Sequence, residues 1–195
     1  MLADFLQKTA NYDSEIEQIK VQIEEYKTEL HIQSDKLIEK RKATASILAE
    51  KIRQKLQILG MPNAQFCIDV QKTKDLRLNG STDITFLFSA NKNSTLKPIN
   101  ETASGGELSR IMLCLKAEIS EAKSLPTIIF DEIDTGVSGD IADKMGNIMQ
   151  EMGNNMQVIC ITHLPQIASK GTEHYIVYKH DDSNTTQTNI KQLLS

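Results

Sequence analysis

The first 59 residues contain neither glycine nor proline, the two residue types that most often interrupt a helix. Within this run, apolar side chains recur in alternating steps of three and four, at Ile16, Ile19, Ile23, Tyr26 and Leu30. This spacing is typical of a heptad seam, along which one helix packs against another. Gly60 and Pro62 then end the run, as residues at a helix end do. The sequence therefore predicts one long helix, and we expect residues 1–60 to form a coiled-coil arm.

The seam does not continue evenly to the end of this arm. Gln33 and Lys40 fall on it, and an apolar stripe resumes out of phase at Ala45, Leu48, Ile52 and Leu59. A stutter or a break between residues 31 and 44 explains the change. Two interpretations remain open. The arm is one strand of an antiparallel coiled coil whose partner strand lies outside this chain, or it is an amphipathic helix packed on its own domain.

The net charge of −4 over 195 residues excludes a protein that is basic throughout. A DNA contact would need a local patch or a partner surface. The basic residues between Lys36 and Lys42 are one such patch, or else a solvated helix face. No segment reads as a signal peptide or a membrane span, and the three cysteines are widely separated. We therefore expect a cytoplasmic protein with reduced thiols and no membrane partner.

From residue 61 onward, strand and helix patterns alternate. Apolar strand patterns occur at residues 66–70, 84–88, 127–131, 157–161, 174–178 and 188–193. Helices are predicted at 107–122, at 138–152 and from Pro165, the first with an apolar face of Leu108, Ile111, Met112, Leu115 and Ile119. The strand 127–131 is apolar enough to be buried on both faces. This order predicts an α/β domain with parallel central strands over residues 61–195.

A glycine-rich turn, Ser104-Gly105-Gly106-Glu107, opens the helix 107–122. A helix N-terminus presents unpaired N–H groups and a partial positive charge, and glycines let an anion approach them closely. The Ser104 hydroxyl can donate to a phosphate oxygen or cap the helix. Glu107 also stands where a capping box would place it, which is the purely structural interpretation.

Further polar groups follow two of the predicted strands. The strand 127–131 ends in Asp131-Glu132, and His163 follows the strand 157–161. Ligands of open α/β sheets bind beyond the carboxyl ends of the strands. There, one carboxylate can hold Mg²⁺ through water, the next can activate a water as general base, and a histidine can donate to a phosphate. An acidic turn cap and a structural histidine are the alternatives. Taken together, these features describe a nucleotide phosphate site.

The sequence around these residues resembles the motifs of the ABC-type ATPases. Residues 103–110 resemble the signature motif, 128–132 the Walker B strand, 134–139 the D-loop and 161–163 the switch histidine. The longer segments ASGGELSRIMLCLK, FDEIDTGVSG and CITHLPQIAS together resemble the RecN family of SMC-like, bacterial DNA repair ATPases. The resemblance implies a fold: the C-terminal lobe of a P-loop NTPase head of the ABC/SMC type, preceded by a long coiled-coil helix.

The resemblance also implies roles for single residues. Asp131 would serve Mg²⁺, and Glu132 and His163 would be catalytic. The signature residues would contact ATP held by the opposite protomer: Ser104, Gly105, Gly106 and Glu107. Ser138 and Gly139 would lie in the D-loop, where many relatives carry Asp in place of Ser138. Two heads would dimerise around ATP, and the complete protein would bind DNA near the bacterial nucleoid and act in repair of double-strand breaks.

The sequence contains no G-x-x-x-x-G-K-S/T loop. The resemblance implies that this phosphate cradle belongs to an N-terminal half outside this chain, so we expect this chain alone to be inactive and to self-associate through exposed apolar surface. Two alternatives remain. One is a head fragment of another SMC-like ATPase, either chromosome-organising or nuclease-associated. The other is a dimerisation module that does not hydrolyse ATP.

Overall fold

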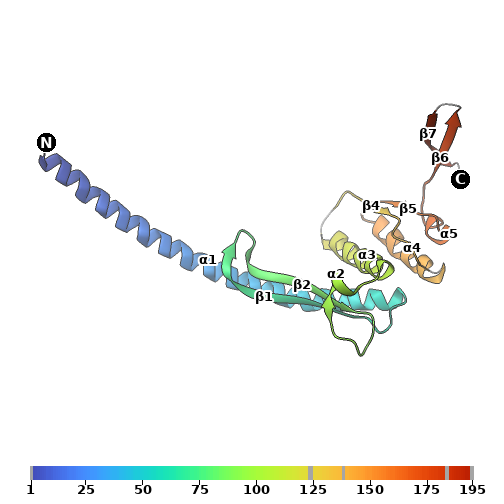
Figure 1. Cartoon of the computed structure of the whole chain (residues 1–195), viewed down its shortest axis with the longest axis horizontal. Coiled ribbons are helices and arrows are strands. Elements are labelled where there is room, and N and C mark those ends of the chain that lie inside the picture. The colour runs from blue at the N-terminus through green and yellow to red at the C-terminus, as the bar shows by residue number, and fades with distance from the viewer. Residues whose placement is uncertain (1, 123–124, 138, 183–184, 194–195) are drawn as a thin grey trace. The chain divides into compact units, whose positions relative to one another are not determined.

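The computed structural model describes residues 2–122, 125–137, 139–182 and 185–193 (Figure 1). The elements in chain order are α1 (Leu2–Ile58), β1 (Gln65–Arg77), β2 (Gly80–Ser89), β3 (Lys97–Pro98), α2 (Ile99–Thr102), α3 (Gly105–Ala122), β4 (Thr127–Asp131), α4 (Gly139–Gly153), β5 (Gln157–Ile161), α5 (Pro165–Ala168), β6 (His174–Asp182) and β7 (Thr185–Leu193). The predicted long helix is confirmed. Ser138, assigned to the D-loop, lies outside the described residues.

The chain divides into two compact units, residues 1–47 with 68–85, and residues 48–67 with 86–195. The elements α1, β1 and β2 each contribute to both units. This division leaves the domain boundary after residue 60 as a prediction.

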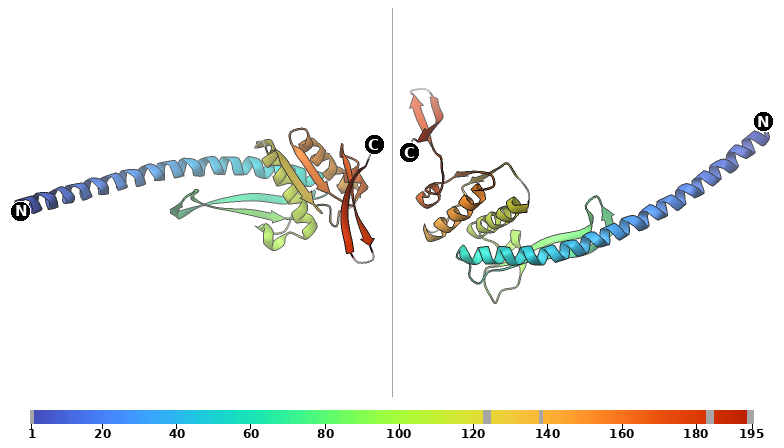
Figure 2. Two further views of the ribbon diagram at one scale, coloured as in Figure 1. Left: turned by 90° about the horizontal axis from the view of Figure 1, so that it is seen from above. Right: turned by 180° about the vertical axis from the view of Figure 1, so that it is seen from behind.

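In the first unit, the tip of the β1–β2 hairpin lies alongside the middle of α1 (Figure 2). The hydroxyls of Ser34 and Ser81, both buried, share a hydrogen bond of 2.6 Å. Gly80 begins β2 with φ 94°, a backbone angle that favours glycine. A Cβ there would lie 3.1 Å from Leu37 Cδ2, so the glycine also permits the close approach of hairpin and helix.

The predicted heptad seam is exposed on α1. Its side chains range from 45% exposed at Ile23 to 65% at Tyr26. Farther along α1, the buried side chains follow a different phase, at Ser34, Ile38 and Ala45. The helix itself is continuous from Leu2 to Ile58, so the change predicted between residues 31 and 44 is a shift of the buried face rather than a break.

In the second unit, α1 ends in the way that Gly60 predicts. Gly60 has φ 79°, its N–H donates to Gln57 O at 3.3 Å, and the Met61 N–H donates to Leu56 O at 3.0 Å. This pair of bonds is the Schellman motif, which satisfies carbonyls that a helix end leaves unpaired. The Arg110 guanidinium then donates to Leu59 O at 2.9 Å and to Gly106 O at 3.0 Å. It thereby joins the end of α1 to the first turn of α3.

A buried carboxylate makes a second link between α1 and α3. Glu118, which is 8% exposed, accepts hydrogen bonds from Lys51 at 3.0 Å and from Lys55 at 2.7 Å. Burial acts to raise the pKa of Glu118, but the two lysines outweigh it and the pKa is lowered. The pair of elements is therefore fixed by charge as well as by apolar packing.

The apolar core of the second unit lies between α3, α4 and the end of α1. Its fully buried side chains include Ile52, Leu56, Leu59, Ile111, Leu113, Cys114, Phe130 and Met145. The face predicted for α3 is partly wrong. Ile111 is buried, but Leu108, Met112 and Ile119 are 37%, 38% and 47% exposed. The helix turns Leu113 and Cys114 inward because it packs on α4 and on α1, and a stripe of apolar side chains remains uncovered.

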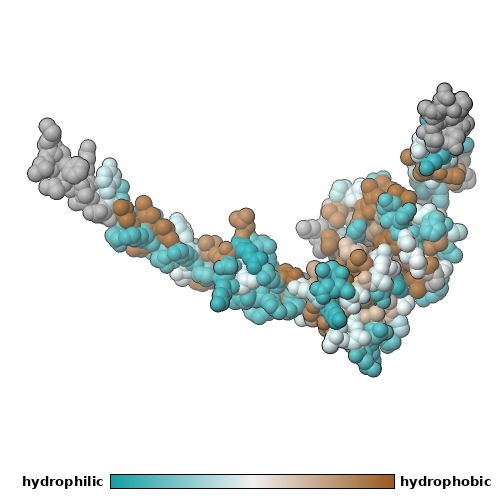
Figure 3. Space-filling view, in the orientation of Figure 1, coloured by the Kyte–Doolittle hydropathy of each residue, from teal (hydrophilic) through white to brown (hydrophobic). Residues whose placement is uncertain are grey.

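Strands β4 and β5 are parallel, as predicted, with Thr127 beside Gln157 and Asp131 beside Ile161. The prediction that β4 is buried on both faces is wrong. Phe130 is buried, whereas Ile129 is 57% exposed, and Ile159 and Ile161 of β5 are 42% and 52% exposed. Figure 3 shows apolar side chains gathered over this part of the unit. One face of the strand pair is thus packed on helices and the other is open, because no described element covers it.

The last two strands, β6 and β7, form an antiparallel hairpin with His174 beside Leu193. Its described apolar side chains are exposed, from 44% at Tyr178 to 70% at Ile190. Among the residues that the structure describes, no helix combines the length and the apolar character needed to cross a membrane.

Candidate functional site

The acidic pair and His163 lie at one edge of the β4–β5 pair. Asp131 is the last residue of β4 and stands beside Ile161, the last residue of β5. The Glu132 N–H donates to Ile161 O at 3.2 Å, which extends the pairing by one residue. His163 follows two residues later, with its side chain 73% exposed. Both carboxylates are exposed as well, so the three side chains are open to a ligand at the carboxyl ends of parallel strands.

Glu132 has an unusual backbone conformation. Its φ is 47°, and no other described non-glycine residue has a positive φ. A left-handed conformation costs a residue with a Cβ roughly 1–2 kcal/mol. Such strain is found at functional sites, where the surrounding structure imposes it. The turn after Glu132 supplies this constraint, because the Thr135 N–H and hydroxyl both donate to Glu132 O, at 3.3 Å and 2.9 Å.

Asp134, which the sequence analysis placed in the D-loop without a role, is the buried centre of this region. It is 1% exposed, and its Oδ2 accepts a hydrogen bond from the Thr162 hydroxyl. His163 Nδ1 lies 3.8 Å from the same oxygen. The signal in the sequence was a further acid after the pair, together with a hydroxyl immediately before the histidine. Neither feature shows by itself that the two segments meet.

The predicted D-loop begins with a tight turn. The Val137 N–H donates to Asp134 O at 3.2 Å, and Gly136 between them has φ 73°. This is the position of a type II turn that requires glycine. Gly139 then begins α4.

The signature turn forms the capping box that was the structural alternative. The Ser104 N–H and hydroxyl both donate to Glu107 Oε2, at 2.8 Å and 2.9 Å, and Ser104 Oγ lies 3.4 Å from the Glu107 nitrogen. The helix begins at Gly105, earlier than the predicted residue 107. Both Ser104 and Glu107 are accessible, so the box closes the helix end without covering it.

The two glycines of this turn have different surroundings. A Cβ at Gly105 would meet nothing within 4 Å, whereas a Cβ at Gly106 would lie 3.7 Å from Thr135 O. The start of α3 therefore lies against the turn that follows the acidic pair, while its Gly105 side is open. An anion can reach the unpaired N–H groups of α3 from that open side.

The described residues hold no group of three or more His, Cys, Asp or Glu side chains suited to a metal ion. Asp131 supplies one exposed carboxylate at this edge, beside that of Glu132. This fits Mg²⁺, which is usually held by one or two carboxylates together with substrate phosphates and water. It does not fit a metal held by protein ligands alone.

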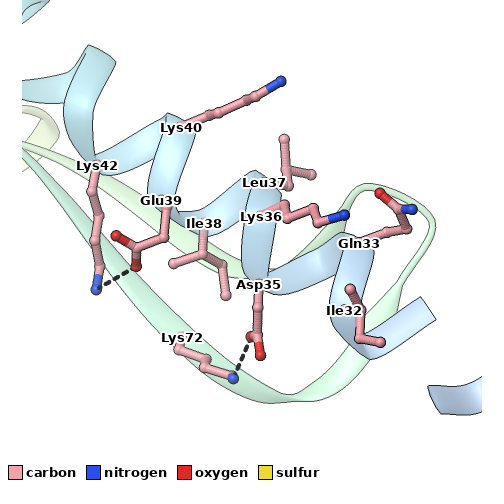
Figure 4. A pocket seen from close by; sticks show the side chains of 10 residues that line it. All are labelled: Ile32, Gln33, Asp35, Lys36, Leu37, Ile38, Glu39, Lys40, Lys42 and Lys72. Carbon is pink, nitrogen blue, oxygen red and sulfur yellow. Dashed lines mark hydrogen bonds and ion pairs between the residues drawn. The ribbon is translucent and has the colours of Figure 1, made fainter. Parts of the chain in front are cut away.

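The basic segment of α1 lines a groove beside β1 (Figure 4). Lys72 pairs with Asp35 at 2.5 Å, and Lys42 lies 4.0 Å from Glu39. Figure 4 shows Lys40 extending away from the side on which Lys42 and Lys72 lie. The ammonium groups do not converge on one point, so this groove is a weaker candidate for a site than the edge of β4–β5.

No protein-family model matches the chain. A DNA repair protein RecN from Halalkalibacterium halodurans is 35% identical over 185 residues, which cover 93% of this chain and 33% of that protein. RecN from Rickettsia typhi is 42% identical over 154 residues, which cover 79% of this chain and 28% of that protein. The chain is homologous to bacterial RecN. It spans about a third of the length of these relatives.

Solved structures show the fold. An Smc head domain with a coiled coil and joint, from Pyrococcus yayanosii, matches with a TM-score of 0.58 at 19% identity, over 76% of this chain and 27% of that one. A second structure comes from work on the ATP-driven dimerization and DNA-stimulated activation of SMC ATPases. It matches with a TM-score of 0.51 at 17% identity, over 78% of this chain and 86% of that one. The predicted fold is confirmed: a mixed α/β fold resembling SMC heads, with a long N-terminal helix.

Proposed function

We propose that this chain is the C-terminal lobe of a RecN ATPase head, which in the complete protein hydrolyses ATP during recombinational repair of DNA double-strand breaks. The observation that carries the proposal is the edge of β4–β5. Asp131, Glu132 and His163 all follow or end these two paired strands and have exposed side chains, and Glu132 has a left-handed backbone conformation. Homology to RecN supplies the biological setting.

Within this proposal, each side chain has one task. Glu132 would accept a proton from the attacking water, with its backbone fixed at φ 47° by the turn that follows it. His163 donates a hydrogen bond to the γ-phosphate from an exposed position. Asp131 would hold Mg²⁺ through water, and the bound ion would neutralise charge on the phosphates.

The signature turn is proposed to bind ATP held by a second protomer. Gly105 leaves open space at the start of an 18-residue helix, whose N–H groups and dipole attract an anion. Ser104 and Glu107 would rearrange from their capping box to contact the nucleotide, while the D-loop near Gly139 would meet the partner head. ATP-driven dimerization described for SMC ATPases supports this arrangement.

The remaining half of the head is proposed to come from residues outside this chain. The open face of β4–β5, the stripe of Leu108, Met112 and Ile119, and the exposed β6–β7 hairpin are apolar surfaces that another lobe would cover. That lobe would also carry the phosphate-binding loop that this sequence lacks. DNA is proposed as a partner of the complete protein, and the exposed seam of α1 as the contact for a second coiled-coil strand.

The test is a Glu132→Gln variant of the complete protein, which keeps the size of the side chain and removes its basicity. We expect ATP turnover to fall roughly 10²–10⁴-fold while equilibrium ATP binding is retained. Glu151→Gln, an exposed carboxylate on α4, is the matched control and should leave turnover unchanged. Undiminished turnover in Glu132→Gln would contradict the proposal. A complete protein without measurable turnover would instead favour a dimerisation module.

A second variant tests the signature turn. Ser104→Arg places a large cation where the nucleotide of the other protomer would lie, and should abolish ATP-dependent dimerisation in sedimentation experiments. Ser94→Arg, in an exposed loop before β3, is the control. Normal dimerisation of the Ser104 variant would refute the role of this turn. Co-purification of a kleisin or a nuclease with the complete protein would favour a different SMC-like machine.

A further inference from the structure

Asp134 is a buried carboxylate in the turn that follows the acidic pair, and no step of the proposed hydrolysis uses it. We infer that Asp134 is a positioning residue: it fixes the segment carrying His163 against the turn carrying Glu132. The inference rests on the proposed function, because it concerns how the site is held and not whether it hydrolyses ATP.

The hydrogen bonds around Thr162 show which group donates and which accepts in its contact with Asp134. The Leu164 N–H donates to Thr162 Oγ1 at 3.0 Å, and an N–H can only donate. The single hydrogen of the Thr162 hydroxyl is then available for Asp134 Oδ2, which accepts it. Thr162 and Leu164 flank His163, so this chain of two hydrogen bonds holds the backbone on both sides of the histidine. It ties segments 28 residues apart across the ends of β4 and β5.

The imidazole of His163 is held less tightly than its backbone. Nδ1 lies 3.8 Å from Asp134 Oδ2, longer than a hydrogen bond but close enough for an electrostatic contact. A small rotation of the exposed ring brings Nδ1–H to the carboxylate. In the imidazolium form, an Nδ1–H directed at Asp134 leaves Nε2–H on the opposite side of the ring, where it can donate to a phosphate oxygen. Asp134 thus selects the orientation in which His163 can meet a nucleotide.

Stability alone does not account for this carboxylate. Asp134 Oδ1 is buried and has no hydrogen-bond partner among the described residues. Burying a carboxylate oxygen without a partner is unfavourable, and a structural link would be expected to satisfy both oxygens. Unsatisfied buried polar groups of this kind are expected at functional sites. The strain of Glu132, two residues earlier in the same turn, is a second unfavourable feature.

The first test measures turnover in the complete protein. Asp134→Asn keeps the shape of the side chain and removes its charge, and we expect kcat to fall about 10- to 100-fold with KM and ATP binding unchanged. Thr162→Val should lower kcat in the same way, and Thr162→Ser, which keeps the hydroxyl, should restore it. Asp35→Asn, an exposed carboxylate of the first unit, is the control. In a His163→Ala background, Asp134→Asn should cause no further loss.

The second test separates positioning from a merely structural role, and uses this chain. Asp134→Asn should leave the thermal midpoint unchanged or raise it, because it removes a buried charge with an unpaired oxygen. The His163 ring should become more mobile in NMR relaxation measurements. A wild-type kcat in Asp134→Asn, an unchanged ring mobility, a lowered thermal midpoint, or a loss that adds fully to that of His163→Ala would each overturn the inference.

The two proposals fail in distinguishable ways. If Glu132→Gln abolishes turnover and Asp134→Asn does not lower it, the inference about Asp134 alone is wrong. If Glu132→Gln leaves turnover unchanged, the proposed function is wrong, and the role given to Asp134 falls with it.

Discussion

Replacing Gly60 by alanine tests how the end of α1 packs against α4 within the second unit. Gly60 combines two requirements that a methyl group violates. Its φ of 79° lies in the left-handed region, and an added Cβ would stand 2.6 Å from Cδ1 and 3.1 Å from Cγ1 of Ile141 on α4. The first requirement belongs to the backbone, and the second to packing between elements that are 81 positions apart by residue number (141 − 60).

The two contributions can be weighed separately. The left-handed conformation costs alanine roughly 1–2 kcal/mol relative to glycine. Overpacking typically costs about 1–3 kcal/mol. Ile141 is only half-buried and Cδ1 is the end of its side chain, so the packing cost should fall in the lower part of that range. We expect Gly60→Ala to lower the free energy of unfolding by about 2–3 kcal/mol.

Urea unfolding of the chain, followed by circular dichroism, measures this loss. Gly136→Ala is the matched control, because Gly136 has a similar φ of 73° but no atom within 4 Å of an added Cβ. It should lose only the backbone contribution, roughly 1–2 kcal/mol. The Ile141→Val background lacks the atom at 2.6 Å. In that background, Gly60→Ala should lower the free energy of unfolding by about 1 kcal/mol less than it does in the wild-type chain.

The reasoning would be refuted by equal losses in Gly60→Ala and Gly136→Ala together with an undiminished loss from Gly60→Ala in the Ile141→Val background. That result would mean that Ile141 moves aside without cost. A loss below that of Gly136→Ala would show that the Schellman motif at Gly60 is not maintained in solution.

Three further predictions concern the same unit. Glu118→Gln should destabilise the chain by about 1–3 kcal/mol at neutral pH, because the buried side chain would no longer pair as a carboxylate with Lys51 and Lys55. Since the pKa of Glu118 is lowered in the folded state, its contribution is present above the ordinary value of 4.5 and is lost as pH falls through the folded pKa, so stability measured from pH 6 to pH 3 should fall less steeply in the variant. Burial raises the pKa of the Cys114 thiol to about 12, so only about 10⁻⁴ of it is thiolate at pH 8, and a thiol reagent should modify it only after unfolding. Ile129→Lys should reduce self-association of the chain in sedimentation velocity, and an unchanged profile would show that the open face of β4 is not a contact surface.

Much of the local structure could be predicted because its causes are local. A run without glycine or proline gives α1, and Gly60, predicted to end it, has a positive φ. Ser104 and Glu107 are near enough in sequence to form their capping box without help from the rest of the chain. The alternation of strands and helices likewise sufficed to predict the parallel pairing of β4 with β5.

The errors occurred where burial depends on distant residues. The spacing on α3 pointed to a face that includes Met112 and Ile119, but packing on α4 and α1 buries Leu113 and Cys114. The apolar composition of β4 suggested two covered faces, although Ile129 is exposed. A periodic pattern says which residues are apolar, and the neighbouring elements decide which of them are covered.

The sequence by itself determined the elements, their order and the polar groups at the strand ends, because propensity, periodicity and turn chemistry act over a few residues. The tertiary structure alone placed Gly106 beside Thr135 and buried Asp134 against Thr162. Those contacts join segments about 30 residues apart, and only the parallel pairing of β4 with β5 and the packing of the helices bring such segments to one edge.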